Sequence, residues 1–91
     1  MNDKTMIALE LAFNDDPRRL DARPAHRAHL ARLHEQGVLV MAGPWADESG
    51  ALLVFRADEA ALDEIMSTDP YYSTPGVSVV AKRAWNPIVG A

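Results

Sequence analysis

Three histidines in one short segment are the residues of this sequence best suited to chemistry. His26, His29 and His34 fall within residues 20–36, where apolar residues recur with the period of a helix. At about 100° per residue, His26 lies near Leu30 in the middle of the apolar stripe, whereas His29 and His34 lie at its flanks. An imidazole buried without a hydrogen-bond partner costs about 1 to 3 kcal/mol. We therefore expect a polar group to meet His26.

Two interpretations of His26 remain open on this pattern. In the first it is a core histidine that bonds a backbone carbonyl. In the second it is a general acid or base, because an ordinary pKa of about 6.5 lets a small shift select either protonation state. The pair with His29 has the spacing of a metal site on a helix, but His29 turns away from the stripe and no third ligand is evident. No metal is expected.

Asp69 is the carboxylate placed to meet a histidine. It follows a predicted helix and precedes Pro70, a common position for Asx-type bonds to the local backbone. Alternatively it fixes the tautomer of a histidine, as an Asp does in hydrolase triads, here without a serine. Arg23 lies three residues before His26 on the same side of the helix, so it either attracts an anionic substrate or forms a surface salt bridge.

Strands and helices alternate along the chain to position these residues. The helix 20–36 ends at Gly37, where a left-handed cap is expected. Pro24 restricts the start of this helix, because proline is tolerated only near the first turn. Either the helix begins between Asp21 and Arg23, or an earlier short turn runs into it, and we favour the first. The other predicted elements are strands over 6–13, 38–42, 51–56 and 77–85, a helix over 58–68, and a loop over 71–76.

The order β-α-β-β-α-β predicts one α+β domain spanning residues 1–91. It is the order of the ferredoxin-like fold, in which two helices cover one face of a four-stranded antiparallel sheet. The other face, expected to carry Leu, Val, Phe and Trp, is too apolar to remain in water. We therefore expect a homodimer that packs through the open sheet face.

Composition excludes several classes of protein. The 91 residues contain 9 Lys and Arg against 13 Asp and Glu, for a net charge of −4, so nucleic acid is not an expected partner. With no Cys, chemistry must come from histidines, carboxylates or hydroxyls. The first residues do not form a signal peptide, and no apolar run approaches the ~20 residues of a membrane span. A cytoplasmic protein with no membrane partner is expected.

A series of short motifs resembles the YCII-related (YciI-like) family over nearly the whole chain. The motifs are Arg23-Pro24-Ala25-His26, Leu30 and Leu33, Gly37-Val38-Leu39, Ala42-Gly43-Pro44, Gly50, Asp69-Pro70-Tyr71, Gly76-Val77 and Trp85-Asn86-Pro87. The resemblance implies a ferredoxin-like fold that dimerises as a dimeric α+β barrel, similar to muconolactone isomerases and small monooxygenases. It also implies an active site at His26 and Asp69, and one branch of the family dehydrochlorinates a chlorinated hydroxyquinol.

The chain departs from the family pattern in two places. The loop over 72–75 is one residue longer than the usual form and is stiffened by Pro75, which alters the expected pocket. Trp45, followed by Asp47 and Glu48, either shapes a pocket mouth or is an exposed hairpin residue. The candidate substrate-binding residues are Arg23, Gly43, Pro44, Trp45 and Tyr71.

The preferred hypothesis is a cofactor-independent enzyme of the lyase, dehydrochlorinase or isomerase kind. In it His26, held by Asp69, moves a proton on a small cyclic or phenolic molecule in an apolar cleft. The alternative is a non-catalytic metabolite-binding or accessory protein in which His26 only donates a hydrogen bond. A heme-dependent or oxygen-handling monooxygenase ranks last, because it requires an axial ligand in an open pocket or different polar groups.

Overall fold

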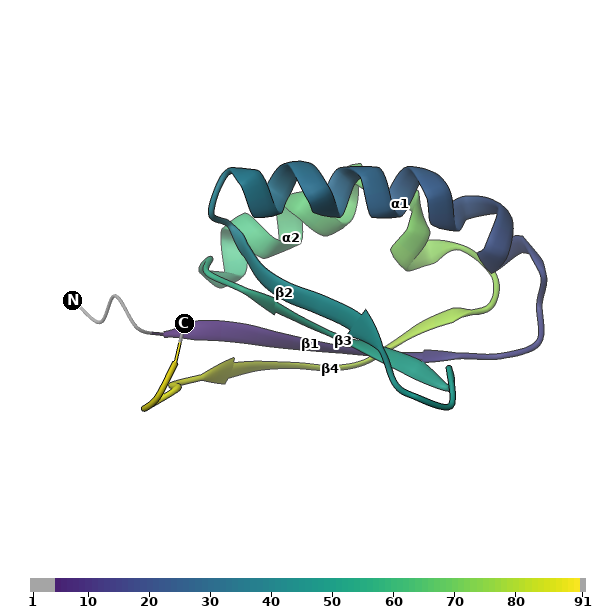
Figure 1. The fold of residues 1–91 in the computed structure, drawn as a ribbon. Helices are drawn as coiled ribbons and strands as arrows, with labels where there is room; N and C mark the ends of the chain where they lie inside the picture. Colours follow the sequence, from purple (N-terminus) through teal and green to yellow (C-terminus); the bar gives the residue numbers. More distant parts are fainter. Residues whose placement is uncertain (1–4, 91) are drawn as a thin grey trace.

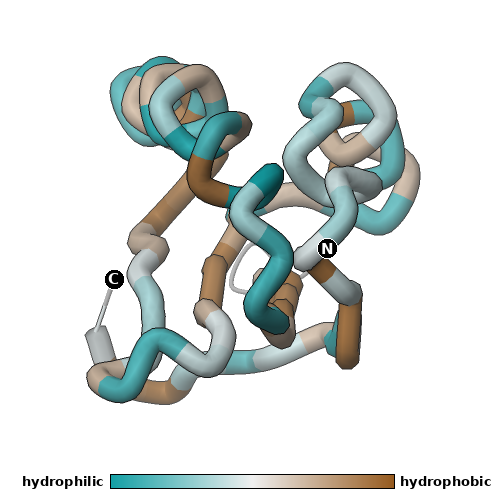
Figure 2. Tube along the Cα trace, turned by 90° about the vertical axis from the view of Figure 1, so that its right-hand side faces the viewer, coloured by the Kyte–Doolittle hydropathy of each residue, from teal (hydrophilic) through white to brown (hydrophobic). Residues whose placement is uncertain are grey.

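The computed structural model describes residues 5–90, which form one antiparallel sheet covered by two helices (Figure 1). The strand order is β2-β3-β1-β4, and both helices lie side by side on the same face of the sheet (Figure 2). The predicted ferredoxin-like α+β fold is therefore confirmed. Its elements are β1 (Met6–Phe13), α1 (Arg18–Glu35), β2 (Leu39–Pro44), β3 (Gly50–Phe55), α2 (Glu59–Thr68), the 3₁₀ turn η1 (Pro70–Ser73) and β4 (Val77–Trp85).

The core lies between the helices and the face of the sheet that they cover. Every second residue of the central strand β1 points into it, and Leu9 and Leu11 are fully buried there. Leu53 and Phe55 of the neighbouring β3 point to the same side, because Leu9 pairs with Leu53 across the two strands. Leu62 of α2 closes this cluster from above. The period-two pattern of β1 is thus explained by burial of one face.

Within residues 5–90, no helix lies over the opposite face of the sheet (Figure 1). The strand register places Met41 and Trp85 on this face, and both are exposed, at 62% and 47%. Glu10 adds a charge to the same face. The two phenylalanines expected there lie instead on the helix side: Phe55 is in the core, and Phe13 packs against it. The open face is therefore less aromatic than the sequence suggested.

Helix α1 begins at Arg18, so the predicted start between Asp21 and Arg23 was wrong. The side chain of Asp16 accepts the backbone N–H of Arg18 at 3.0 Å, which stabilises an extra turn ahead of Pro24. Pro24 therefore lies inside the helix and has no N–H to donate to the carbonyl of Leu20. Leu20 is exposed, so water can bond that carbonyl.

The other end of α1 follows the prediction. Gly37 has a φ of 79°, the left-handed conformation that glycine adopts without steric cost. Its N–H donates to the carbonyl of His34, and the N–H of Val38 donates to the carbonyl of Leu33, the two bonds of a Schellman cap. Within the described residues, no helix combines the length and the apolar character that a membrane crossing requires.

Two glycines facing different surroundings provide a test of the sheet packing. A Cβ added at Gly50 would collide with the backbone carbonyl of Leu11 on β1, whereas one added at Gly43 meets nothing within 4 Å. We expect Gly50→Ala to lower the free energy of unfolding by about 1 to 3 kcal/mol, because the strand pair must shift. Gly43→Ala, the matched control, should change it by less than about 0.5 kcal/mol. Urea denaturation at fixed protein concentration measures both, and equal effects would contradict the close approach of β3 to β1.

Candidate active site

The centre of the site is a contact between helix α1 and the segment after α2. His26 Nδ1 lies 2.6 Å from Asp69 Oδ2, and both residues are buried. The other carboxylate oxygen of Asp69 accepts the backbone N–H of Tyr71 at 3.0 Å, which starts the 3₁₀ turn η1. Both interactions considered for Asp69 are therefore present, since one oxygen bonds the local backbone and the other bonds a histidine.

Two tyrosines of η1 hold the plane of the His26 ring. The Tyr71 ring is stacked on the imidazole, with centroids 3.9 Å apart and planes within 7°. The Tyr72 ring meets the imidazole edge-on, at 5.3 Å and 90°. Since η1 also contains the backbone N–H bonded to Asp69, one short turn fixes both the ring and its carboxylate partner. The predicted loop over 71–76 is thus partly ordered as a turn that builds the site.

Burial and hydrogen bonding favour a neutral His26 beside an ionised Asp69. Burial lowers the pKa of His26 below its ordinary value, and the hydrogen bond and negative charge of Asp69 oppose this only in part. Burial acts to raise the pKa of Asp69, but hydrogen bonds from His26, the Tyr71 backbone and His29 outweigh it and lower the pKa. His26 therefore donates its Nδ1–H to the carboxylate. This tautomer leaves the Nε2 lone pair free to accept a proton.

His29 also contacts Asp69, which the sequence analysis did not foresee. Its Nδ1 lies 3.3 Å from the same Oδ2 atom, and its side chain is 23% exposed. The sequence feature that could have predicted this contact is the three-residue spacing from His26. This spacing places both imidazoles on one side of the helix, within reach of the same carboxylate. The two imidazoles share a carboxylate, and no group of three or more metal-binding side chains occurs among the described residues.

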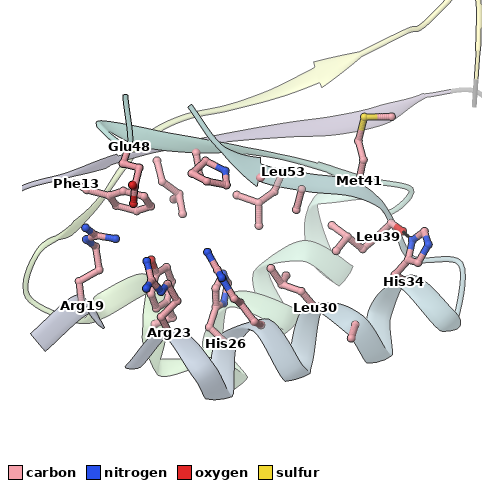
Figure 3. A pocket seen from close by; sticks show the side chains of 18 of the residues that line it. Phe13, Arg19, Arg23, His26, Leu30, His34, Leu39, Met41, Glu48 and Leu53 are labelled. Carbon is pink, nitrogen blue, oxygen red and sulfur yellow. Dashed lines mark hydrogen bonds between the residues drawn. The ribbon is translucent and has the colours of Figure 1, made fainter. Parts of the chain in front are cut away.

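A cavity of about 500 Å³ lies between α1 and the β2–β3 side of the sheet (Figure 3). His26 lines it, and Nε2 of His26 has no hydrogen-bond partner among the described residues yet is not a buried atom, so solvent reaches it. This volume is in the range of small-molecule sites. Of the candidate substrate-binding residues, the structure places Arg23, Gly43, Pro44 and Tyr71 on the cavity wall.

Trp45 is the candidate that the structure does not bring to the cavity. It lies at the start of the hairpin between β2 and β3, 40% exposed, and is not among the lining residues. Its backbone N–H pairs with the carbonyl of Gly50, which closes the hairpin. Of the two possibilities for Trp45, this placement fits the exposed hairpin residue. The sequence analysis missed Arg19 and Arg27, which line the same wall as Arg23.

The fold and the site together define an α+β protein in which a buried histidine and aspartate pair opens onto a cavity beside a ferredoxin-like sheet. The family model of the YCII-related domain matches residues 5–86, and the chain belongs to that family. No curated protein matches the sequence.

The charge state of the pair can be measured by titration. We expect the pKa of His26, followed by its imidazole NMR signals, to lie below 6.5, because burial exceeds the influence of Asp69. Asp69→Asn should lower it further, since both of the named influences that raise it come from that carboxylate. Asp63→Asn, which removes an exposed partner of Lys82, should leave it unchanged. A pKa above 6.5 in the unaltered protein would contradict the assignment.

The lowered pKa of His26 also predicts how the free energy of unfolding depends on pH. Because the folded protein binds the His26 proton more weakly than the unfolded chain does, the unfolded chain takes up more protons below about pH 6.5. This histidine should therefore lower the free energy of unfolding as pH falls from about 6.5 to its folded pKa. Urea denaturation across that window, compared with His26→Gln, isolates its contribution.

Proposed function

We propose that this protein is a cofactor-independent enzyme that transfers a proton on a small molecule held in the cavity, with His26 as general acid and base. One observation supports the proposal above all: the 2.6 Å contact that orients His26 while its other ring nitrogen opens onto a cavity of ligand size. A histidine that served only the core would have no reason to present a free nitrogen there. Asp69 is the positioning residue, and it also stabilises the imidazolium that forms during transfer.

The chemistry that suits this arrangement is removal of a proton from a carbon next to a carbonyl or a related electron sink. His26 Nε2 accepts the proton, and the electron pair of the C–H bond moves onto the carbonyl oxygen. Returning the proton to another atom gives an isomer. In dehydrochlorination the electron pair returns from the oxygen to form a carbon–carbon double bond as the C–Cl bond of the neighbouring carbon breaks, chloride leaves, and His26 releases its proton to water. Both outcomes need a base that is unprotonated at neutral pH. The lowered pKa of His26 keeps its imidazole in this form. A cyclic or phenolic substrate fits the apolar part of the wall formed by residues such as Leu30, Leu39 and Leu53.

A substrate panel with one isosteric variant tests the proposal. Chlorinated hydroxyquinols, lactones and enones are incubated in D₂O, and deuterium uptake, isomerisation and chloride release are followed by NMR and an ion electrode. For a compound that turns over, His26→Gln should slow the reaction about 100-fold to 10,000-fold, because glutamine can donate a hydrogen bond but cannot accept and return the proton. The dissociation constant of the same compound for His26→Gln, measured by calorimetry, should change far less than the rate.

Asp63→Asn serves as the control, since Asp63 is exposed on α2 and pairs with Lys82. It should react at the unaltered rate. Saturable binding of panel compounds with no reaction above the background, unchanged in His26→Gln, would instead identify a metabolite-binding protein. That result would overturn the catalytic proposal.

We further propose that two copies associate through the open sheet face, burying Met41 and Trp85. The support is the exposure of these large apolar side chains on a face that no helix covers (Figure 1). A small chain also gains stability by burying such a face against a second copy.

Sedimentation equilibrium tests the association. The unaltered protein should sediment at twice its 10.0 kDa chain mass. Trp85→Lys should shift it toward the monomer, because it places a charge in the buried face. Leu20→Lys, which alters an exposed leucine on helix α1, should leave it unchanged. A monomeric unaltered protein would refute the association.

A further inference from the structure

Positive charge is concentrated on the cavity wall of a protein that is negative overall. Among the described residues, the lining includes three arginines, Arg19, Arg23 and Arg27, and a single acidic residue, Glu48. The formal charge of the wall is therefore +2 with its histidines neutral, against −4 for the whole chain. Such a local excess of one sign raises the concentration of oppositely charged ligands at the site.

The three arginines form a row along helix α1. They stand four residues apart, so they rise on neighbouring turns of one side of the helix. Figure 3 shows Arg19 and Arg23 extending from α1 into the cavity toward Phe13 and Glu48. His26 and Leu30 follow them along the same helix. Along the helix, Arg19 and Arg23 thus lie at one end of the cavity and Leu30 toward the other, with His26 and Arg27 between them.

No acidic group among the described residues forms an ion pair with an arginine of this row. The ion pairs of the described chain involve Arg18, His26, His29 and Lys82, and none includes an arginine of the cavity. The Arg19 guanidinium lies 4.3 Å from the centre of the Phe13 ring, which fixes its position. Its Nε atom is buried with no hydrogen-bond partner. A buried donor of this kind is costly unless a ligand or water accepts from it.

We propose that the substrate is a small carboxylate, with its anionic group at Arg19 and Arg23 and its apolar part against Leu30, Leu39 and Leu53. The planar guanidinium matches a carboxylate through two parallel hydrogen bonds, which favours this anion over a single-oxygen phenolate. The helical rise puts His26 about 4.5 Å beyond Arg23 along the axis, so the carbon that loses its proton lies a few bonds from the carboxylate. This inference rests on the proposed function for the role of His26, whereas the binding of the anion stands on the arginines alone.

Calorimetry with matched ligands tests the charge requirement. The probes are 3-phenylpropanoate, its neutral amide 3-phenylpropanamide, and 4-nitrophenolate in mildly alkaline buffer. We expect the carboxylate to bind about 10-fold or more tightly than the amide, as charge-assisted hydrogen bonds add that much. The phenolate should bind more weakly than the carboxylate. Equal affinity for carboxylate and amide, or preference for the phenolate, would overturn the proposal.

Two substitutions in the cavity wall should change the affinity for 3-phenylpropanoate in opposite directions. Arg23→Gln should weaken 3-phenylpropanoate about 10-fold and leave the amide nearly unchanged, because it removes the bidentate donor. Glu48→Gln should tighten the carboxylate, since it removes the one like charge of the lining. Arg32→Gln, outside the cavity on the same helix, is the matched control and should have no effect. If neither cavity variant changes binding of the carboxylate, the arginine row does not hold it.

A second readout separates failure of this inference from failure of the proposed function. His26→Gln should still bind 3-phenylpropanoate, because the anion is held one turn away. The panel is extended with carboxylate analogues of its lactones and enones. If carboxylates bind through Arg23 but neither they nor any other compound of the extended panel exchanges or reacts, the carboxylate site stands and the proton-transfer proposal falls. If neutral compounds react through His26 as fast as their carboxylate analogues, the proton-transfer proposal stands and the carboxylate requirement falls.

Discussion

The carboxylate of Asp69 is the interaction on which the site depends. Asp69 is the residue at which helix α2 ends, and its carboxylate accepts the Tyr71 N–H that starts the turn η1 and contacts His26 and His29 of helix α1. It is buried at 5% exposure, so its charge requires these donors. The hydrogen bonds that stabilise the buried carboxylate of Asp69 also select the tautomer of His26. The contacts that stabilise the buried charge are therefore the same contacts that place the proton on Nδ1 of His26.

Much of the fold could be predicted because local patterns and tertiary burial agree. The period-two pattern over 6–13 matches the strand β1, and Gly37 marks the end of α1 where the left-handed conformation is needed. The start of α1 was missed for a physical reason. The side chain of Asp16 accepts the Arg18 N–H and lets the helix begin before Pro24, whereas the prediction rested on Pro24 alone.

The candidate site was predictable in its centre and not in its surroundings. His26 could be selected because it lies in an apolar stripe, and Asp69 because it stands at a helix end before proline. The contact of His29 depends on where α2 and η1 lie against α1, which one helix cannot reveal. Likewise, the absence of Trp45 from the cavity and the presence of Arg19 and Arg27 follow from how far α1 stands from β2 and β3. Such separations are set by packing across the whole domain.

Most of the cavity wall and the groups that hold the His26 ring come from different parts of the chain. Nearly all lining residues lie between Leu11 and Leu53, and only Tyr71 comes from beyond β3. The carboxylate and the ring that stacks on His26 come from residues 69–71. Selection can therefore alter what the cavity accepts through changes in the first part while the basicity of the histidine is kept by the second. A fold divided in this way can change the shape and charge of its cavity without altering the surroundings of His26.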